Sequence, residues 1–364
     1  MNLKKIIFYH PSFEKGGVEK ILVNLIEYSI KQKIKVQLIS SNSKLKKNKY
    51  FETFKVKKFD GRLKTTIFSI FILIKILIKN FRNRKATCLL SFQSNSVAIC
   101  FGKFLGFKVA IRNSEYPLGS LNNNDDNILK SFLIFAQKII VYNFANLIIS
   151  NSIGSKNTIK NFIIQKHKVI HIYNPYLKKI NKKNYKYKKD VVLFVGRFTK
   201  QKGIIYLLKA FSLFLNKFSQ FQLWFVGSGP DEKLIKEYIK QNNLNKNIKI
   251  LPWQKNLNLI YKTSKIFVLP SIYEGLGNVL IEALNHSRAC IASDCEHGPS
   301  EILMNGKNGY IFKSKNFKSL YKKLIFVQKN FKLAKKKIIN GRKNLNRFLI
   351  LEQSEKYLNA LRKV

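Results

Sequence analysis

The stretch LPSIYEGLGNVLIE, residues 269–282, carries the signals that decide the fold. Apolar residues 266–269 predict a buried strand that ends at Pro270, and apolar residues return at helical spacing from Val279 onward. A glycine-bracketed loop therefore joins a strand to a helix. Backbone amides at such a helix start can bind an anion, and Glu282, about one turn later, could accept hydrogen bonds from sugar hydroxyls. The stretch predicts a ligand that contains both a phosphate and a sugar.

The same alternation of strand and helix signals runs through both halves of the chain. Apolar runs predict strands at residues 6–10, 36–40, 54–59, 88–92, 109–113, 147–150, 190–196, 221–226, 248–251, 266–269 and 289–293. Such alternation predicts parallel sheets covered by helices on both faces. The polar segment 176–189 has no periodicity and is interpreted as a linker between two domains.

Composition bounds the class of protein. The chain has 364 residues, of which 46% are hydrophobic, so we expect a folded protein of about two domains. The net charge of +49 points to nucleic acid or an anionic membrane, although scattered lysines also fit a compositional bias, because only nine of the 68 basic residues are arginines. The four cysteines lack C-x-x-C spacing, which argues against zinc or a disulfide framework. We expect no signal peptide and no membrane span.

Two further glycine loops carry candidate binding residues. Gly16 and Gly17 separate the first strand from the first helix, where a doubly wound sheet receives a phosphate or a sugar. The loop GRFTKQKG, residues 196–203, places Arg197 after a strand and Lys202 at a helix entry, and two cations there can hold a diphosphate. The turn GSGPDE, residues 227–232, is interpreted as mainly structural.

In this order, the motifs GG, GRxxxxKG, GSGP and EGLGNVLIE resemble the retaining glycosyltransferases of family 4, which have the GT-B fold. The resemblance extends from about residue 10 to residue 312, and the tract SDCEHGPSEIL, residues 293–303, is similar to members that build bacterial surface polysaccharides. It implies an α/β chain of two Rossmann-like domains whose parallel sheets face each other across a cleft. Residues 1–175 would bind the acceptor and residues 190–345 the nucleotide-sugar donor. Residues 346–364 would form a C-terminal helix that could pack back on the N-terminal domain.

The resemblance also assigns roles within the donor site. Arg197 and Lys202 would stabilise the leaving diphosphate, Glu282 would bind the ribose, and Glu274 would lie beside the transferred sugar, so Glu274, Arg197 and Lys202 are the predicted catalytic residues. The predicted donor-binding set is Gly16, Gly17, Arg197, Lys202, Trp253, Glu274, Gly275, Leu276, Gly277, Asn278, Val279 and Glu282. Neither a metal nor another cofactor is expected, because the two cations take the role of a divalent ion.

The acceptor side departs from the family pattern. Many relatives carry a histidine after the strand that corresponds to residues 109–111, where this chain has Arg112, Asn113 and Glu115. These three residues, together with His10 at the end of the first strand, are the acceptor-binding candidates. The usual Gly-x-Pro after the second motif glutamate is replaced by Ser287-Arg-Ala.

The function implied is the transfer of a hexose or N-acetylhexosamine, with retention, from a nucleotide-diphosphate sugar, UDP being favoured. The acceptor would be a growing, lipid-linked, cell-surface glycan at the cytoplasmic face of an anionic inner membrane, and no nucleic acid is expected. The alternatives are a GT-B epimerase or phosphorylase-like enzyme, and a basic nucleic-acid-binding protein. The basic apolar segment 63–81 fits either a helix resting on the bilayer or one facing the domain core.

Overall fold

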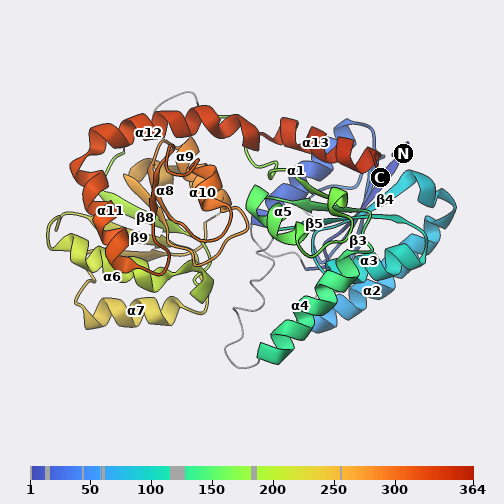
Figure 1. Ribbon diagram of the computed structural model, residues 1–364, viewed down its shortest axis with the longest axis horizontal. Coiled ribbons are helices and arrows are strands. Elements are labelled where there is room, and N and C mark those ends of the chain that lie inside the picture. The colour runs from blue at the N-terminus through green and yellow to red at the C-terminus, as the bar shows by residue number, and fades with distance from the viewer. Residues whose placement is uncertain are drawn as a thin grey trace. The chain divides into compact units, whose positions relative to one another are not determined.

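The chain folds into two compact units. The computed structural model describes residues 2–12, 17–42, 45–57, 59, 62–114, 128–181, 187–254 and 256–364. Unit 1 comprises Met1–Lys178 and Arg347–Val364, and unit 2 comprises Lys179–Asn346. Each unit is an α/β layer structure built on its own parallel sheet (Figure 1).

Unit 1 is built on seven parallel strands in the order β3-β2-β1-β4-β5-β6-β7. The strands are β1 (Lys5–Tyr9), β2 (Lys35–Ser40), β3 (Phe51–Lys55), β4 (Thr87–Ser91), β5 (Lys108–Asn113), β6 (Leu147–Ser150) and β7 (Val169–His171). The central strands are buried along nearly their whole length, which is why they read as continuous apolar runs and not as alternating ones. The chain reverses its direction across the sheet between β1 and β4.

Helices cover both faces of this sheet. They are α1 (Gly17–Lys31), α2 (Arg62–Lys79), η1 (Phe81–Ala86), α3 (Asn95–Phe104), α4 (Ile128–Tyr142), α5 (Ile153–Lys160), η3 (Lys166–Lys168) and α13 (Ile350–Arg362). Because crossovers between parallel strands are right-handed, α1 covers one face and α2 to α5 the other. Helix α13 packs on α1, while α2 packs on α3 and α3 on α4 (Figure 1).

Unit 2 has six parallel strands in the order β10-β9-β8-β11-β12-β13. They are β8 (Val191–Val195), β9 (Gln222–Val226), β10 (Ile248–Leu251), β11 (Ile266–Leu269), β12 (Ala289–Ser293) and β13 (Tyr310–Phe312). This is the order of a dinucleotide-binding Rossmann sheet, whose ligands lie where the strand order reverses, here between β8 and β11.

The helices of unit 2 form two layers around an aromatic core. They are η4 (Lys200–Lys202), α6 (Ile204–Leu215), α7 (Glu232–Gln241), α8 (Asn258–Thr263), α9 (Asn278–Asn285), α10 (Pro299–Ile302), α11 (Phe317–Lys329), α12 (Phe331–Lys343) and η5 (Asn344–Phe348). Helix α6 packs on α7 and α11, whereas α9, α10 and α12 pack on β12. Fully buried Phe194, Phe211, Phe214 and Phe225 fill the space between sheet and helices.

The prediction of two parallel-sheet, Rossmann-like α/β domains is confirmed. One strand was misplaced: the structure has β3 at Phe51–Lys55, not at residues 54–59. Val56 lies beyond the end of the strand but is buried, so the apolar pattern continues past Lys55 and the predicted strand was placed too late in the chain. Strands β7 and β13 were not predicted, since three residues are too few to show a period.

The boundary between the units lies within the polar segment 176–189. The backbone amides of Tyr176 and Leu177 both donate to the carbonyl of Phe348, at 3.1 and 2.9 Å, inside unit 1. The ring of Tyr173 packs between those of His171 and Phe348, with centroid distances of 4.2 and 4.9 Å, and so links β7 to residue 348. Residues 347–364 therefore return to unit 1 and pack on it. Residues 182–186 lie outside the described part of the chain.

His171 makes the stability of this junction depend on pH. Burial, with Lys156, Lys356 and Arg347 nearby, lowers its pKa from 6.5 to about 4. Between pH 6.5 and about 4 the unfolded chain therefore binds a proton that the folded chain does not, so stability falls as the pH falls through this window. We expect His171→Gln to flatten that fall, measured as the melting temperature of unit 1 against pH. The exposed His167→Gln should keep the wild-type slope, and parallel curves for wild type and His171→Gln would contradict the assignment.

Candidate functional site

The loop after β8 places two cations at the carboxyl end of the central strand of unit 2. Arg197 follows Gly196 directly and is exposed. Lys202 ends η4, and its side chain is 14% exposed. Gly203 then starts α6 with φ +61°, and a Cβ there would lie 2.2 Å from the carbonyl oxygen of Pro270. Only glycine allows this close approach between the loops that follow β8 and β11.

The loop after β11 is held against the first loop by a buried ion pair. Lys202 Nζ pairs with Glu274 Oε1, and Ser271 Oγ donates to the same carboxylate oxygen at 2.9 Å. Two bonds to Gln201 support the pairing: Ile272 donates its backbone amide to the Gln201 carbonyl at 2.8 Å, and the Gln201 side chain donates to the Tyr273 carbonyl at 3.0 Å. Two motifs that are about 70 residues apart thus form one site at the strand-order reversal of the sheet.

Helix α9 begins at the end of this loop. Gly277 precedes its first residue, Asn278, in a left-handed conformation with φ +88°. The first backbone amides of the helix have no partner within their own helix, and this end carries partial positive charge. The predicted residues Gly275, Leu276 and Val279 lie in the same loop and first turn. The arrangement can receive an anionic group beside Lys202.

Glu282 lies one turn further along α9 and is partly exposed. Tyr261 on α8 donates its hydroxyl to Glu282 Oε2 at 3.2 Å, and its ring stacks on His286 at 4.9 Å with an interplanar angle of 17°. His286 Nδ1 lies 2.8 Å from the Glu282 carbonyl oxygen and therefore donates to it. Burial lowers the pKa of His286, which favours the neutral ring. Tyr261 and His286 thus fix the helix turn and the carboxylate.

The tract 293–303 supports the same loop from behind. Ser293 Oγ donates to the Ser271 carbonyl at 2.5 Å, and Tyr273 forms a β-bridge with Glu296. Gly298 has φ +69°, and a Cβ on it would lie 2.6 to 2.7 Å from backbone atoms of Leu276. This part of the predicted motif therefore shapes the loop after β11 through backbone packing.

The remaining predicted features of unit 2 lie around this centre. Trp253 follows β10, two strands from β8, and is 45% exposed. The turn GSGPDE has a structural role, because Ser228 accepts from the Phe198 amide at 2.8 Å and Asp231 donates its amide to the Phe198 carbonyl at 3.1 Å.

Ser287, Arg288 and Ala289, which stand in place of the usual Gly-x-Pro, are buried. Ser287 takes φ +60°, a backbone conformation that favours glycine. Arg288 is 1% exposed and donates Nε to the His286 carbonyl at 2.8 Å and Nη1 to the Ser264 carbonyl. Its burial lowers the pKa of its guanidinium to about 10. Arg288 thus connects the end of α8 to the start of β12.

In unit 1 the predicted residues divide into two groups. Gly17 begins α1 and is exposed, and His10 follows β1 with its Nε2 3.4 Å from Glu19 Oε1. Gly16 and Glu115 lie outside the described residues. Gln93, which the sequence did not indicate, accepts from the Ser12 amide at 3.0 Å beside the reversal point between β1 and β4.

Arg112 and Asn113 do not lie on a loop, as predicted for acceptor contacts, but are the last residues of β5 and are 1% and 2% exposed. Arg112 donates to Asn174 Oδ1 at 2.7 Å, and Asn113 donates to Ser155 Oγ at 2.9 Å. Burial lowers the pKa of Arg112, while Tyr357 and Glu19 raise it. Both side chains therefore connect elements inside unit 1, and their role in acceptor binding stays a prediction.

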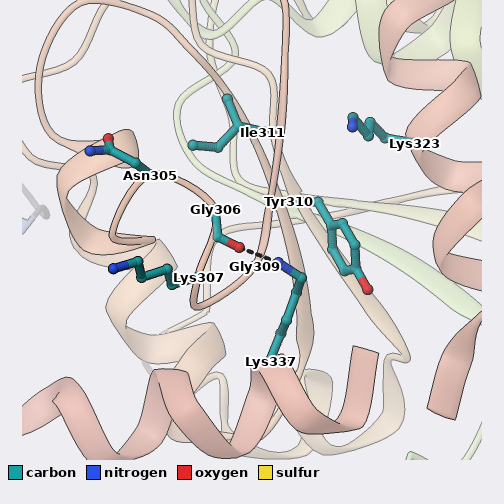
Figure 2. A pocket seen from close by; sticks show the side chains of 8 residues that line it. All are labelled: Asn305, Gly306, Lys307, Gly309, Tyr310, Ile311, Lys323 and Lys337. Carbon is teal, nitrogen blue, oxygen red and sulfur yellow. Dashed lines mark hydrogen bonds between the residues drawn. The ribbon is translucent and has the colours of Figure 1, made fainter. Parts of the chain in front are cut away.

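A groove of about 400 Å³ opens elsewhere on unit 2 (Figure 2). It is lined by Asn305, Gly306, Lys307, Gly309, Tyr310, Ile311, Lys323 and Lys337. Lys337 donates to the Gly306 carbonyl and closes one side. None of the predicted donor residues lines this groove.

Neither a metal-binding cluster nor a membrane-spanning helix occurs among the described residues. Within them, no group of three or more His, Cys, Asp or Glu side chains is placed to hold a metal ion. No helix in the described ranges is long and apolar enough to cross a membrane.

Comparison with known proteins agrees with this geometry. Residues 177–344 match the family described as Glycosyl transferases group 1. An uncharacterised glycosyltransferase of Haemophilus influenzae is 23% identical over 332 residues, which cover 88% of this chain and 90% of that protein. The crystal structure of a Staphylococcus aureus TarM mutant with Fondaparinux, alpha-GlcNAc-glycerol and UDP has a TM-score of 0.78 at 16% identity and covers 98% of this chain and 99% of its own.

A relative from Campylobacter jejuni is named for its acceptor. This N-acetylgalactosamine-N,N'-diacetylbacillosaminyl-diphospho-undecaprenol 4-alpha-N-acetylgalactosaminyltransferase is 28% identical over 209 residues, 56% of this chain and 55% of that protein. Further matches are to glycosyltransferases of amylovoran, capsular polysaccharide and lipopolysaccharide core biosynthesis. Fold, family match and relatives together support a glycosyltransferase with the GT-B architecture.

The packing of Gly298 on Leu276 yields a test of the site. A methyl group at Gly298 must displace the Leu276 backbone, so we expect Gly298→Ala to weaken nucleotide binding at least tenfold, measured by calorimetry with UDP. Gly306→Ala is the matched control, because Gly306 also has positive φ, at +92°, but a Cβ there meets no atom closer than 4.0 Å. Equal UDP affinity in both variants, with both folded, would show that the backbone packing does not shape the site.

Proposed function

We propose that this chain is a retaining glycosyltransferase that uses a nucleotide-diphosphate sugar, with UDP as the favoured nucleotide. It would transfer a hexose or N-acetylhexosamine to a growing, lipid-linked glycan of the cell surface. The single observation that carries the proposal is the joining of Arg197, Lys202, Glu274 and the start of α9 at one sheet edge, with Glu282 one turn away. This set offers partners for every part of a sugar nucleotide except the base.

The donor diphosphate is assigned to the cations. Lys202 is nearly buried and is paired with Glu274, so it already lies in a low-dielectric position with its charge balanced. An arriving phosphate would share Lys202 with Glu274, while the exposed Arg197 could offer two parallel N–H donors to phosphate oxygens. The α9 amides would add neutral donors. Glu274 would then be free to accept hydrogen bonds from hydroxyls of the transferred sugar.

The reaction would break the bond between the anomeric carbon and the diphosphate oxygen and form a bond to the acceptor oxygen on the same face. The acceptor proton would pass to the departing phosphate, so no separate strong base is required. Arg197 and Lys202 would stabilise the charge that grows on the diphosphate, and positioning would supply much of the remaining rate. No metal or other cofactor is part of the proposal, since these cations balance the charge that a divalent ion would balance. His10, with Gln93 nearby, is proposed on the acceptor side of unit 1.

Two relatives support the proposed substrates. The TarM mutant structure contains UDP together with a glycoside, and the Campylobacter jejuni enzyme is named for an acceptor linked to diphospho-undecaprenol. A polyprenyl-linked acceptor lies in a lipid bilayer. We therefore also propose peripheral attachment at the cytoplasmic face of an anionic membrane.

Substituting the charged donor contacts tests the proposal. We expect Arg197→Ala to lower kcat/KM for a UDP-sugar by about 10²- to 10³-fold, because it removes a donor aimed at the leaving group. Glu282→Ala should weaken UDP binding by about 10- to 100-fold through the loss of charge-assisted bonds to the ribose. Transfer or hydrolysis of UDP-sugars measures the first, and calorimetry measures the second. The exposed Arg362→Ala and Glu237→Ala are matched controls that should change neither.

The same variants separate this function from the alternatives. A thermal-shift series with UDP-, GDP- and ADP-sugars should show stabilisation by one nucleotide series, and no response to any would contradict the proposal. A nucleic-acid-binding protein would instead retain DNA in a salt-sensitive manner as its only activity. An epimerase would convert the free sugar nucleotide without an acceptor.

Tyr261 provides a second test at the ribose. We expect Tyr261→Phe to weaken UDP binding by about 3- to 10-fold, because Glu282 loses one hydrogen bond that orients it. The loss should vanish for 2′,3′-dideoxy-UDP, which has no ribose hydroxyls for Glu282 to bind. Tyr238→Phe is the control, since its hydroxyl bonds Ser212 on the same unit, at 3.2 Å, away from the site. If both nucleotides bind more weakly by the same factor, Tyr261 supports the loop and does not act through Glu282.

A further inference from the structure

Unit 1 exposes large apolar side chains on one layer of helices. They lie on α2, on η1, at the end of α3, on α4, and at Phe144 just after α4. They are Ile67, Phe68, Phe71, Ile78, Phe81, Phe104, Leu133, Ile134, Ile140 and Phe144, with Phe71 at 68% and Phe104 at 87%; elsewhere unit 1 also exposes Ile153, Ile164 and Leu351. Single exposed apolar residues are ordinary, but ten on adjacent helices form a surface that calls for a partner.

Helix α2 has two apolar faces. Leu73, Ile76 and Leu77 are buried in the core of unit 1. Ile67, Phe71, Ile74 and Ile78, spaced i, i+4, i+7 and i+11, form a second stripe on the opposite side, and three of them are exposed. The core therefore accounts for only one of the two faces.

Helix α4 repeats the pattern. Phe135 and Tyr142 are buried, whereas Leu133, Gln137, Ile140 and Phe144 follow the same i, i+4, i+7 and i+11 spacing and are all exposed. Helices α2, α3 and α4 lie on the same side of unit 1, because α2 packs on α3 and α3 on α4 (Figure 1). The residues opposite each stripe are buried, so both stripes belong to the exposed side of this helix layer. They form one docking face.

The docking face is positively charged. Lys64, Lys75 and Lys79 lie beside the α2 stripe, and Arg82 follows it, all of them exposed. Residues 61–178, which supply these helices and the strands beneath them, contain 17 Lys and Arg residues and three acidic residues, Glu115, Asp125 and Asp126. A local excess this one-sided selects an anionic partner.

Three partners of different chemistry can be weighed against these features. A second copy of this chain would bring like charges together, which disfavours pairing through this face. Nucleic acid would satisfy the lysines through phosphate but would leave the Ile and Phe stripes in water. An anionic bilayer satisfies both, because apolar side chains enter the boundary of headgroups and acyl chains while Lys and Arg reach the lipid phosphates.

We propose that the docking face formed by α2, η1, the tip of α3 and α4 binds the surface of an anionic lipid bilayer. This inference deepens the proposed function and rests on it, because the lipid-linked acceptor that would require membrane binding is part of that function. Phe71, Ile78, Ile140 and Phe144 enter the interface, and Lys64, Lys75 and Lys79 bind headgroups beside them. Unit 1 would thereby be held at the surface that contains its acceptor.

Vesicle flotation of the full chain tests this face. We expect wild type to float with vesicles of phosphatidylethanolamine and phosphatidylglycerol and to bind phosphatidylcholine vesicles far less. The stripe variant Phe71→Ser/Ile78→Ser/Ile140→Ser should lose at least tenfold in partitioning to the anionic vesicles. The charge variant Lys64→Gln/Lys75→Gln/Lys79→Gln should lose about fivefold per lysine at low salt and show a weaker salt dependence.

Matched variants on α12 serve as controls. Leu333→Ser/Ile339→Ser removes exposed apolar residues, and Lys332→Gln/Lys335→Gln/Lys336→Gln removes the same charge from unit 2. Both should float like wild type. The inference is overturned if wild type does not bind anionic vesicles, if control and test variants lose binding equally, or if the stripe variant changes only the oligomeric state in ultracentrifugation.

Nucleotide binding distinguishes this inference from the proposed function. UDP affinity of the stripe and charge variants should equal that of wild type, because all the substituted residues belong to unit 1, whereas the charged residues of the proposed donor site belong to unit 2. Vesicle binding without any response to sugar nucleotides would contradict the proposed function but support the docking face. A response to UDP-sugars without vesicle binding would support the proposed function and contradict the docking face.

Discussion

The parallel pairing of β8 with β11 is the constraint on which the rest of unit 2 depends. Ile266 pairs with Val192 and Phe267 with Leu193, so the carboxyl ends of both strands reach the same edge of the sheet. The loops that follow them are then close enough for Lys202 to bond Glu274 and for Ile272 to bond Gln201. The start of α9 continues from the second loop. Without this register the cations and the carboxylates would be separate surface features.

The Lys202–Glu274 pair explains how a charged ligand site can exist in a nearly dry position. A lysine or glutamate buried alone would lose its charge or destabilise the fold, and removing one partner of such a pair costs about 3–5 kcal/mol. Here Lys202 Nζ bonds Glu274 Oε1, and Ser271 Oγ is an additional donor to the same oxygen. In the proposed function, a phosphate beside Lys202 would meet a cation that is already ordered and largely shielded from water, which would strengthen the interaction. The buried thiol of Cys295, whose pKa burial raises to about 12, adds no charge to this environment.

The scarce arginines show how one residue type serves different ends. Arg197 is exposed at the end of β8, where its fork can meet an anion. Arg288 is buried and donates to the backbone carbonyls of His286 and Ser264, which connects the end of α8 to the start of β12. Arg112 is buried in unit 1 with Asn174, and its ring contact is Phe92, at 5.3 Å. Burial thus separates Arg112 and Arg288, which bond within their own units, from Arg197, which is exposed.

The sequence by itself determined the two parallel α/β units and the motifs at their strand ends, because buried parallel strands are continuous apolar runs and their turns need glycine. It could not place β7 and β13, which are too short to show a period, nor identify Tyr261, whose hydroxyl meets Glu282 across 21 positions of chain. It left segment 63–81 open between core and surface. The tertiary structure shows that one face of this helix lies in the core and the other at the surface. Leu73, Ile76 and Leu77 are buried, whereas Ile67, Phe71 and Ile78 are exposed. A helical pattern gives the spacing of apolar residues, whereas only the neighbours in space decide which of them are covered.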